Sequence, residues 1–287
     1  MSTIQLLGSA AAEAIPAIFC DCRICREAWR LGGKDVRMRT AYKLNDHVRV
    51  DFGPDSLAQE YRFALHSERL KHLFLTHSHE DHLYANLLGY RIKGFSKIPE
   101  GSVLNIYGDR GVIRQINKFF WDKFYFDGDW SKYGIALHPV KEFEKISLPE
   151  EDMEFWALPA DHMIGVPTDE PHVYAFRYGQ SWGLICNDSG FPREPFWEFV
   201  KERKFCFDLV IADACGEIHV NCERGHMGGN TCIAFKERLE KEGLIHSGTK
   251  YILNHFSHNG GALQSEMEAH FGPHGMEIGY DGMVVEF

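Results

Sequence analysis

Long apolar runs are absent from this sequence of 287 residues. No run approaches the roughly 18–20 apolar residues that a membrane-spanning helix needs. The first residues, MSTIQLLGSAAAEAIPAIF, lack the basic start of a secretory signal and already include Glu13 and Pro16. We therefore expect a cytoplasmic protein without a membrane partner, in a compartment where cysteines stay reduced.

Basic residues are also scarce. Lys and Arg number 31 against 41 Asp and Glu, which gives a net charge of −10. Nucleic-acid backbones and anionic lipids are bound by clustered Lys and Arg, so this balance argues against either as a partner. A small phosphorylated substrate stays open, because the local field at a site can differ in sign from the net charge.

No linker rich in Pro, Gly and Ser divides the chain, which is 44% hydrophobic and 25% charged. A chain of this composition and length can bury a sizeable core. Strand-like runs are expected at 3–7, 38–44, 47–52, 72–75, 103–107, 154–158, 173–178, 182–186, 208–212 and 251–253. Helical spacing is expected at 57–70, 82–90, 110–124, 194–201, 230–241 and 263–270. This order predicts an α+β protein, two sheets flanked by helices, as a single domain over residues 1–287.

Aromatic residues concentrate in FFWDKFYFDGDW, residues 119–130, within a possible insert near 108–133. One interpretation is a buried helix face followed by a turn. A second interpretation is a lid beside a substrate pocket. Aromatic side chains left exposed here would alternatively serve a homodimer contact.

Candidate metal-ligating residues are concentrated in the segment THSHEDH, which contains His77, His79, Asp81 and His82. In an extended chain, residues i and i+2 point to the same side, so His77 and His79 can face one ion. Asp81 and His82 follow where the next helix starts and can face a second ion. Burying so many unpaired ionisable groups would be costly, so a metal site is the favoured interpretation.

This segment resembles the HxHxDH signature of the metallo-β-lactamase superfamily, and the resemblance extends along the chain. Asp51 in VRVDFG, His162 in LPADH, Asp188 in CNDSG and His255 in LNHFSH match further motifs of that family. The resemblance implies an αββα sandwich. It also implies that His77, His79 and His162 hold one ion, that Asp188 bridges, and that the second ion is held by Asp81, His82 and His255.

Three cysteines form a second cluster, Cys20-Asp-Cys22-Arg-Ile-Cys25, with thiols spaced to wrap one tetrahedral zinc. This CxCxxC resembles a branch of the superfamily that includes the phosphoribosyl cyclic phosphate phosphodiesterases and the PqqB proteins. In the phosphodiesterases a histidine three residues after the last active-site histidine completes the zinc site, and His258 matches it. We expect the other cysteines to pack as small core residues: Cys186, Cys206, Cys215, Cys222 and Cys232.

A further histidine, His226 in RGHMGGN, matches an active-site histidine of the phosphodiesterases. At a helix start beside two ions it can protonate a leaving group or bind a phosphate oxygen, although an exposed structural histidine would have the same spacing. The expected mechanism is hydrolysis by a hydroxide bridging two ions, either manganese or zinc, with one structural zinc elsewhere. Asp81 and Asp188 are expected to act as ligands first and to help orient the nucleophile.

The favoured function is a phosphodiesterase for a small cyclic phosphate or nucleotide-like ester. A lactone, thioester or β-lactam hydrolase of the same fold would share every active-site ligand. A non-hydrolytic, PqqB-like protein of cofactor biosynthesis is the third alternative, and the filled set of ligand positions argues against it.

Overall fold

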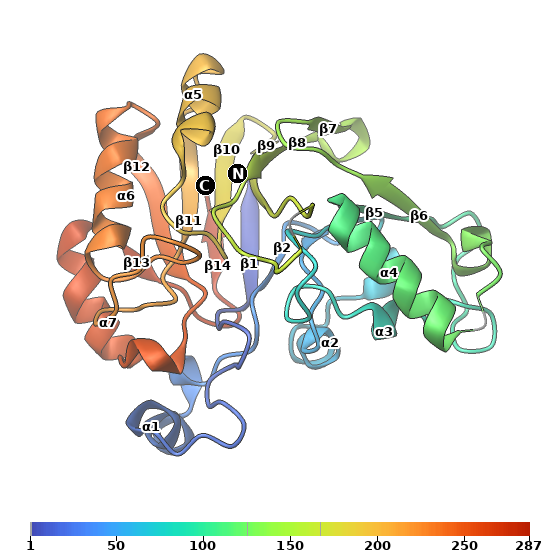
Figure 1. The fold of residues 1–287 in the computed structure, drawn as a ribbon, viewed down its shortest axis with the longest axis horizontal. Coiled ribbons are helices and arrows are strands. Elements are labelled where there is room, and N and C mark those ends of the chain that lie inside the picture. The colour runs from blue at the N-terminus through green and yellow to red at the C-terminus, as the bar shows by residue number, and fades with distance from the viewer. Residues whose placement is uncertain (1, 125, 167) are drawn as a thin grey trace.

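The strands form two sheets of seven in the computed structural model, which describes residues 2–124, 126–166 and 168–287 (Figure 1). The first sheet has the order β14-β1-β2-β3-β4-β5-β6. Its strands are β1 (Thr3–Gly8), β2 (Ala41–Lys43), β3 (Val48–Val50), β4 (His72–Phe74), β5 (Leu104–Gly108), β6 (Ile135–Pro139) and β14 (Val284–Glu286). Strands β3 to β6 are parallel, whereas β14, β1, β2 and β3 pair antiparallel.

The second sheet has the order β13-β12-β11-β10-β9-β8-β7. Its strands are β7 (Lys145–Leu148), β8 (Met153–Pro159), β9 (His172–Tyr178), β10 (Ser181–Cys186), β11 (Phe207–Asp213), β12 (Ile245–Asn254) and β13 (Glu277–Ile278). Strands β10 to β13 are parallel to one another, and β8 runs in the same direction because β9 is antiparallel to both β8 and β10.

Helices flank the two sheets, and α1 lies below the sheets in the view of Figure 1. They are α1 (Arg23–Leu31), α2 (Ser56–Phe63), α3 (Ala85–Leu88), α4 (Arg110–Lys123), α5 (Glu194–Glu202), α6 (Asn230–Lys241) and α7 (Gln264–Phe271). Helices α5 to α7 share one apolar cluster with the second sheet, and α3 and α4 share another with the first. The αββα sandwich implied by the family resemblance is therefore confirmed.

The central core lies between the sheets. Buried side chains of β1 to β4 meet buried side chains of β8 to β12 in one cluster, in which Phe74 and Phe155 stack with ring centroids 3.9 Å apart. Burial of apolar surface at about 25 cal/mol per Å² supplies most of the stabilisation of such a core. The sandwich thereby gives the loops at the strand ends a rigid base.

Helix α4 shows how local sequence sets an element. Asp109 caps it by accepting hydrogen bonds from the backbone N–H groups of Gly111 and Val112, each at 2.9 Å. Val112, Ile116 and Phe120 recur at intervals of four and are fully buried against the first sheet. The helix ends at Lys123 in place of the expected residue 124.

Two helices are shorter in the structure than their apolar sequence patterns predicted. The helix expected over 57–70 ends at Phe63, because Ala64 and His66 adopt left-handed backbone conformations and a short 3-10 turn follows. The helix expected over 82–90 is reduced to α3. The strands β6, β7, β13 and β14 and the helix α1 were not expected, and four of these five elements have five or fewer residues.

Among the described residues, no helix has the length and apolar character required to cross a membrane.

Candidate metal centre

The predicted ligands lie where strands of the two sheets end. Strands β10, β11 and β12 are parallel, with Cys186 opposite Ala212 and Asp213 opposite Asn254. Their carboxyl ends therefore meet at one edge of the sheet, which brings together Asp188 and His255 in the loops that follow β10 and β12. His162 follows β8, which ends at the same edge.

The first sheet contributes further residues of the site, from the edge that faces these strand ends. Strands β3 and β4 are parallel, with Val50 opposite Phe74, so Asp51 and the THSHEDH loop follow neighbouring strand ends. The α-helical turn expected to carry His82 starts only at Ala85, and residues 76–84 form an irregular loop. This loop folds back because the backbone N–H of Leu83 donates to the carbonyl of His79 at 2.8 Å.

Three histidines form the first cluster. His77, His79 and His162 each offer a ring nitrogen, and these atoms all lie within 4.8 Å of one another. Nε2 of His162 lies 3.2 Å from Nδ1 of His79. The three imidazoles come from two loops, in which His77 and His162 are 85 residues apart in the sequence. Their ring nitrogens lie close together, in an arrangement suited to a divalent transition metal.

Two carboxylates and two histidines form the second cluster, again within 4.8 Å of one another: Asp81, His82, Asp188 and His255. All four are buried. Nε2 of His82 lies 3.2 Å from Asp81 and 2.7 Å from Asp188, and Nε2 of His255 lies 3.3 Å from Asp188. This mixed His and Asp set suits zinc or manganese.

Asp188 touches both clusters. Its Oδ2 lies 3.5 Å from Nε2 of His77, and its Oδ1 lies 3.4 Å from Nδ1 of His162. Burial opposes the charged form, but His255 and His82 hold the pKa of Asp188 well below its usual range. A carboxylate that stays ionised between two ligand sets has the position of a bridging ligand.

The unpaired buried nitrogens fit bound metal ions. Nε2 of His77 and both ring nitrogens of His255 are buried and have no hydrogen-bond partner. Leaving such atoms unsatisfied costs about 1–3 kcal/mol each, so native proteins seldom leave several together. Metal coordination would satisfy the two Nε2 atoms, whereas Nδ1 of His255 lies 3.3 Å from Asp213.

Asp51 orients the ligands without belonging to either cluster. Its Oδ2 lies 2.7 Å from Nδ1 of His82, and its Oδ1 accepts hydrogen bonds from the backbone N–H and hydroxyl of Thr76 at 2.9 and 3.0 Å. The Thr76 hydroxyl in turn lies 3.0 Å from Nδ1 of His77. Occupied Nδ1 atoms leave Nε2 of both rings for a metal, an arrangement common around metal-bound histidines.

Asp213 is the site residue that sequence reasoning missed. Its fully buried carboxylate accepts from the backbone N–H groups of Asp188 and Met227, each at 2.9 Å, and lies 3.2 Å from Nδ1 of His226. It also lies 3.3 Å from Nδ1 of His255. The available signal was an acidic residue at the end of the apolar run FDLVIAD.

His226 lies beside the second cluster. Its Nδ1 is 3.3 Å from Asp188 and 3.2 Å from Asp213, and its side chain is 31% exposed. Burial favours the neutral ring, but the hydrogen bond and charge of Asp213, with Asp188, raise the pKa of His226. The ring therefore lies at the centre and remains partly open to a substrate.

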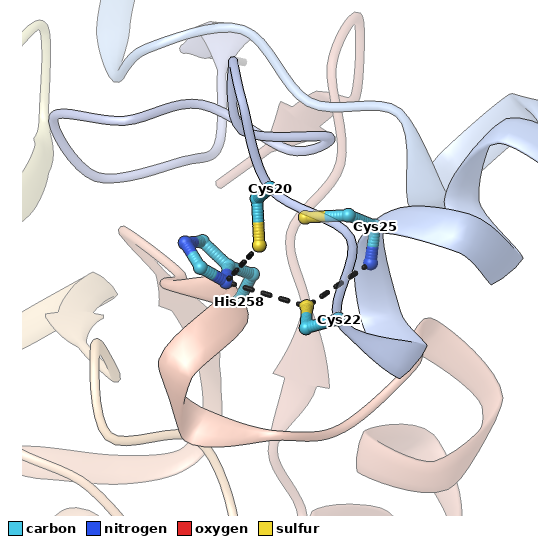
Figure 2. Close-up of side chains that lie close together, drawn as sticks. All are labelled: Cys20, Cys22, Cys25 and His258. Carbon is cyan, nitrogen blue, oxygen red and sulfur yellow. Dashed lines mark hydrogen bonds between the residues drawn. The ribbon is translucent and has the colours of Figure 1, made fainter.

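The cysteine cluster lies where α1 begins, and His258 reaches it from the far end of the sequence (Figure 2). Sγ of Cys20 and Sγ of Cys22 lie 3.6 and 3.5 Å from Nδ1 of His258. With Cys25 these ligand atoms lie within 4.8 Å of one another. Burial opposes ionisation, but the backbone N–H of Cys25 and contacts with Cys20 and His258 lower the pKa of Cys22 to about 6. This donor set suits zinc.

The other cysteines only partly follow expectation. Cys186 and Cys232 are buried in the core, as expected. The prediction was wrong for Cys206, which is exposed, because it lies in the turn between α5 and β11 and not within an element. Cys215 and Cys222 are half-buried, and Sγ of Cys215 lies within 4.8 Å of ring nitrogens of His226 and His255.

The aromatic segment 119–130 packs mainly into the core. Phe120 and Phe126 are buried, and Phe120 contacts Trp130 with ring centroids 4.6 Å apart. Trp121 is exposed. Tyr125 lies outside the described residues. The lid and homodimer interpretations stay predictions.

Comparisons with known proteins concern the family and the fold. The sequence model of the metallo-beta-lactamase superfamily matches residues 47–213. The fold is similar to that of a diphosphatase from the PhnP family (21% identity, TM-score 0.75, covering 100% of this chain and 98% of the other). It is also similar to zinc-bound PqqB from Methylobacterium extorquens (16%, 0.73, 99% and 100%) and to the short form of human tRNase Z (16%, 0.63, 99% and 98%). No curated protein matches the sequence.

Proposed function

The chain belongs to the metallo-beta-lactamase superfamily, and on this premise we propose that it is a dinuclear phosphodiesterase. The proposed substrate is a small cyclic phosphate or nucleotide-like ester. The superfamily consists mostly of metal-dependent hydrolases, and the candidate ligands described above support metal binding. The proposed cofactors are two divalent ions, manganese or zinc, and one structural zinc.

The contacts of Asp188 carry the proposal of two ions. The carboxylate lies within 3.5 Å of His77 and within 3.4 Å of His162, and it also contacts His82 and His255. We assign His77, His79 and His162 to one ion and Asp81, His82 and His255 to the other, with Asp188 between them. When bound, such a pair of ions activates water and neutralises charge that develops on a phosphoryl group.

The protein side chains would orient the nucleophile and supply the proton for the leaving group. Asp81 and Asp188 fix the positions of the ligand rings and help to orient the nucleophile. His226 is held by Asp213 on one side of the centre, and the hydrogen bond and charge of Asp213 raise the pKa of the ring, which favours its protonated form. We propose that His226 gives this proton to the oxygen of the leaving group.

The experiment is a comparison of substrates on the metal-loaded protein. We expect hydrolysis of bis(p-nitrophenyl) phosphate and no hydrolysis of a simple lactone or thioester. The His79→Ala variant should lose at least about 100-fold in rate while its circular dichroism spectrum is unchanged. His246→Ala is the matched control, because His246 pairs with Asp208 at the surface and should keep full activity.

The opposite pattern would overturn the assignment. Turnover of the lactone without turnover of the phosphodiester would identify a carboxyl-ester type of hydrolase with the same ligands. Full activity in His79→Ala would show that the metal site is assigned wrongly.

A further inference from the structure

A thiol outside the proposed ligand sets lies against the dinuclear centre. Sγ of Cys215 lies within 4.8 Å of a ring nitrogen of His226 and of a ring nitrogen of His255, and these two nitrogens lie within the same distance of each other. One thiolate and two imidazoles supply three of the four donors of a tetrahedral zinc site and leave the fourth position to water. Cys215, His226 and His255 are therefore the donor set of a further candidate metal site.

The backbone holds the thiol beside His226. Oδ1 of Asp213 accepts hydrogen bonds from the backbone N–H groups of Cys215 and Met227, at 3.0 and 2.9 Å. The backbone N–H of Gly216 donates to the carbonyl of Met227 at 2.9 Å, so the two chain segments lie side by side. Cys215 and His226 are therefore positioned as neighbours before an ion binds, which reduces the conformational entropy that binding would cost.

The two imidazoles face each other at the partly open side of the centre. The rings of His226 and His255 stack with centroids 5.6 Å apart and an interplanar angle of 16°. His255 is buried, and both of its ring nitrogens lack a hydrogen-bond partner. The His226 side chain is 31% exposed, and Cys215 is half-buried. An ion from solvent can therefore reach the thiol and both rings.

The thiol makes this donor set softer than the dinuclear centre. The second cluster of that centre contains two carboxylates, Asp81 and Asp188, which suit manganese as well as zinc. A thiolate instead prefers thiophilic ions, and an ion that binds it displaces the proton of the thiol into solvent. Because His255 belongs to both donor sets, an ion at the thiol competes with the second ion for this ring.

We propose that Cys215, His226 and His255 form an inhibitory site for a thiophilic divalent ion, with Cd²⁺ as the probe. An ion bound there takes His255 from the second ion of the dinuclear centre and occupies His226, which otherwise protonates the leaving group. The number of ions per chain stays the same, because one ion replaces another. The loss of activity rests on the proposed phosphodiesterase function, whereas binding of the ion does not.

The test adds cadmium to protein that holds zinc at the cysteine cluster and manganese at the dinuclear centre. We expect cadmium to release manganese, counted by electron paramagnetic resonance of the free ion, and to produce the ultraviolet charge-transfer band of a cadmium thiolate. Hydrolysis of bis(p-nitrophenyl) phosphate should fall in parallel. Cys215→Ala should keep its basal rate and lack the band, and it should need at least about tenfold more cadmium for the same release.

Cys222→Ala is the matched control. Cys222 is a second half-buried thiol between β11 and α6, but its Sγ lies 3.7 Å from the carbonyl of Val220 and outside the donor set. This variant should respond to cadmium like the wild-type protein. Exchange at the cysteine cluster is the same in all three proteins and is measured by the zinc released. Equal manganese release and an equal band in the wild-type protein and Cys215→Ala would overturn the site.

Failure of the proposed function gives a different result. If the loaded protein does not hydrolyse the phosphodiester, that proposal fails, while manganese release and the ultraviolet band still test the site. If the protein binds no manganese, calorimetry counts the cadmium ions bound per chain. Fewer ions in Cys215→Ala than in Cys222→Ala would support the site, and equal numbers would overturn it. Manganese lost from Cys215→Ala before cadmium is added would instead make Cys215 a ligand of the dinuclear centre and overturn the inhibitory site.

Discussion

At the scale of single residues, the metal centre depends on backbone conformations that side chains seldom adopt. Asp51, Asp188 and His255 have φ values of 64°, 51° and 66°. Asp and His tolerate this left-handed region better than most residues, yet each such conformation is less favourable than an ordinary one. All three lie just after the ends of strands, which are β3, β10 and β12 respectively.

We predict that Asp51 determines which ring nitrogen of His82 carries the proton. In Asp51→Asn, the Oδ1 atom can still accept from Thr76, while the new amide would face Nδ1 of His82 with a donor. His82 would then carry its proton on Nε2 and lose its ability to bind a metal. We expect a 10–100-fold loss of metal affinity, measured by titration of the metal-depleted protein.

Asp208→Asn is the control for this prediction. Oδ1 of Asp208 lies 3.0 Å from Nε2 of His246, the same kind of pair at the surface and outside the metal centre. This variant should bind metal like the wild-type protein. Unchanged metal affinity in Asp51→Asn would show that Asp51 does not set the His82 tautomer.

Motif spacing predicted most residues of the site, because His77, His79, Asp81 and His82 are close in sequence. That these four residues lie close to Asp188 and His255 could be predicted only from the family resemblance. Asp213 was missed because its role depends on being opposite Asn254 in the sheet, and strand register is not visible in one sequence.

At the scale of elements, one loop connects the two metal-binding groups. His255 belongs to the dinuclear site, and His258 reaches the cysteine cluster three residues later. Between them, the Ser257 hydroxyl donates to Glu13, and Nε2 of His258 lies 3.7 Å from the same carboxylate. The loop thereby links α1 and the N-terminal segment to the end of β12.

Removal of one thiol should therefore affect stability before chemistry. Cys22→Ala takes away a proposed zinc ligand and the cap at the start of α1, where Sγ accepts from the backbone N–H of Cys25. We expect one zinc ion fewer per chain, measured by mass spectrometry of the metals, and a lower Tm. The exposed Cys206, changed to Ala, is the control, and equal zinc content in both variants would contradict the zinc role.

The segment after β11 contains a buried acid whose titration should weaken the fold. Burial raises the pKa of Glu217 to about 8, although one oxygen accepts from the backbone N–H of Ala262 at 2.6 Å. The folded protein therefore binds this proton more tightly than the unfolded chain. The favourable contribution is complete below about pH 4.5 and is lost as pH rises through about 8.

Glu217→Gln isolates that effect. Between about pH 5 and 8 the free energy of unfolding of the wild-type protein should fall by up to about 1.4 kcal/mol per pH unit relative to the variant. Urea unfolding at several pH values measures the difference. Parallel pH profiles for the two proteins would show that Glu217 is ionised in the folded state.

Elements were predictable where the apolar period was long and uninterrupted. The expected helix over 230–241 coincides with α6. The helix expected over 57–70 ends early in the structure, because Ala64 adopts a left-handed backbone conformation that the apolar pattern does not reveal. Helix α1 was not expected, because the cysteines that open it were interpreted only as ligands. Short edge strands such as β13 have too few residues to show a period.

At the scale of the whole molecule, the two sheets bring their strand ends to one place. The sandwich core holds both sheets rigidly, so ligands from residues 77 to 255 meet with little freedom left to lose on metal binding. The chain has a net charge of −10, and bound cations would supply the local positive field that an anionic ester needs.

The rate of bis(p-nitrophenyl) phosphate hydrolysis, measured against the number of metal ions bound per chain during stepwise reconstitution, shows whether hydrolysis requires a dinuclear centre. We expect three ions at full loading, one with the cysteines and two at the dinuclear centre. Hydrolysis should appear only as the last two ions bind. Full activity at one ion per chain, or no hydrolysis at three, would contradict a dinuclear phosphodiesterase.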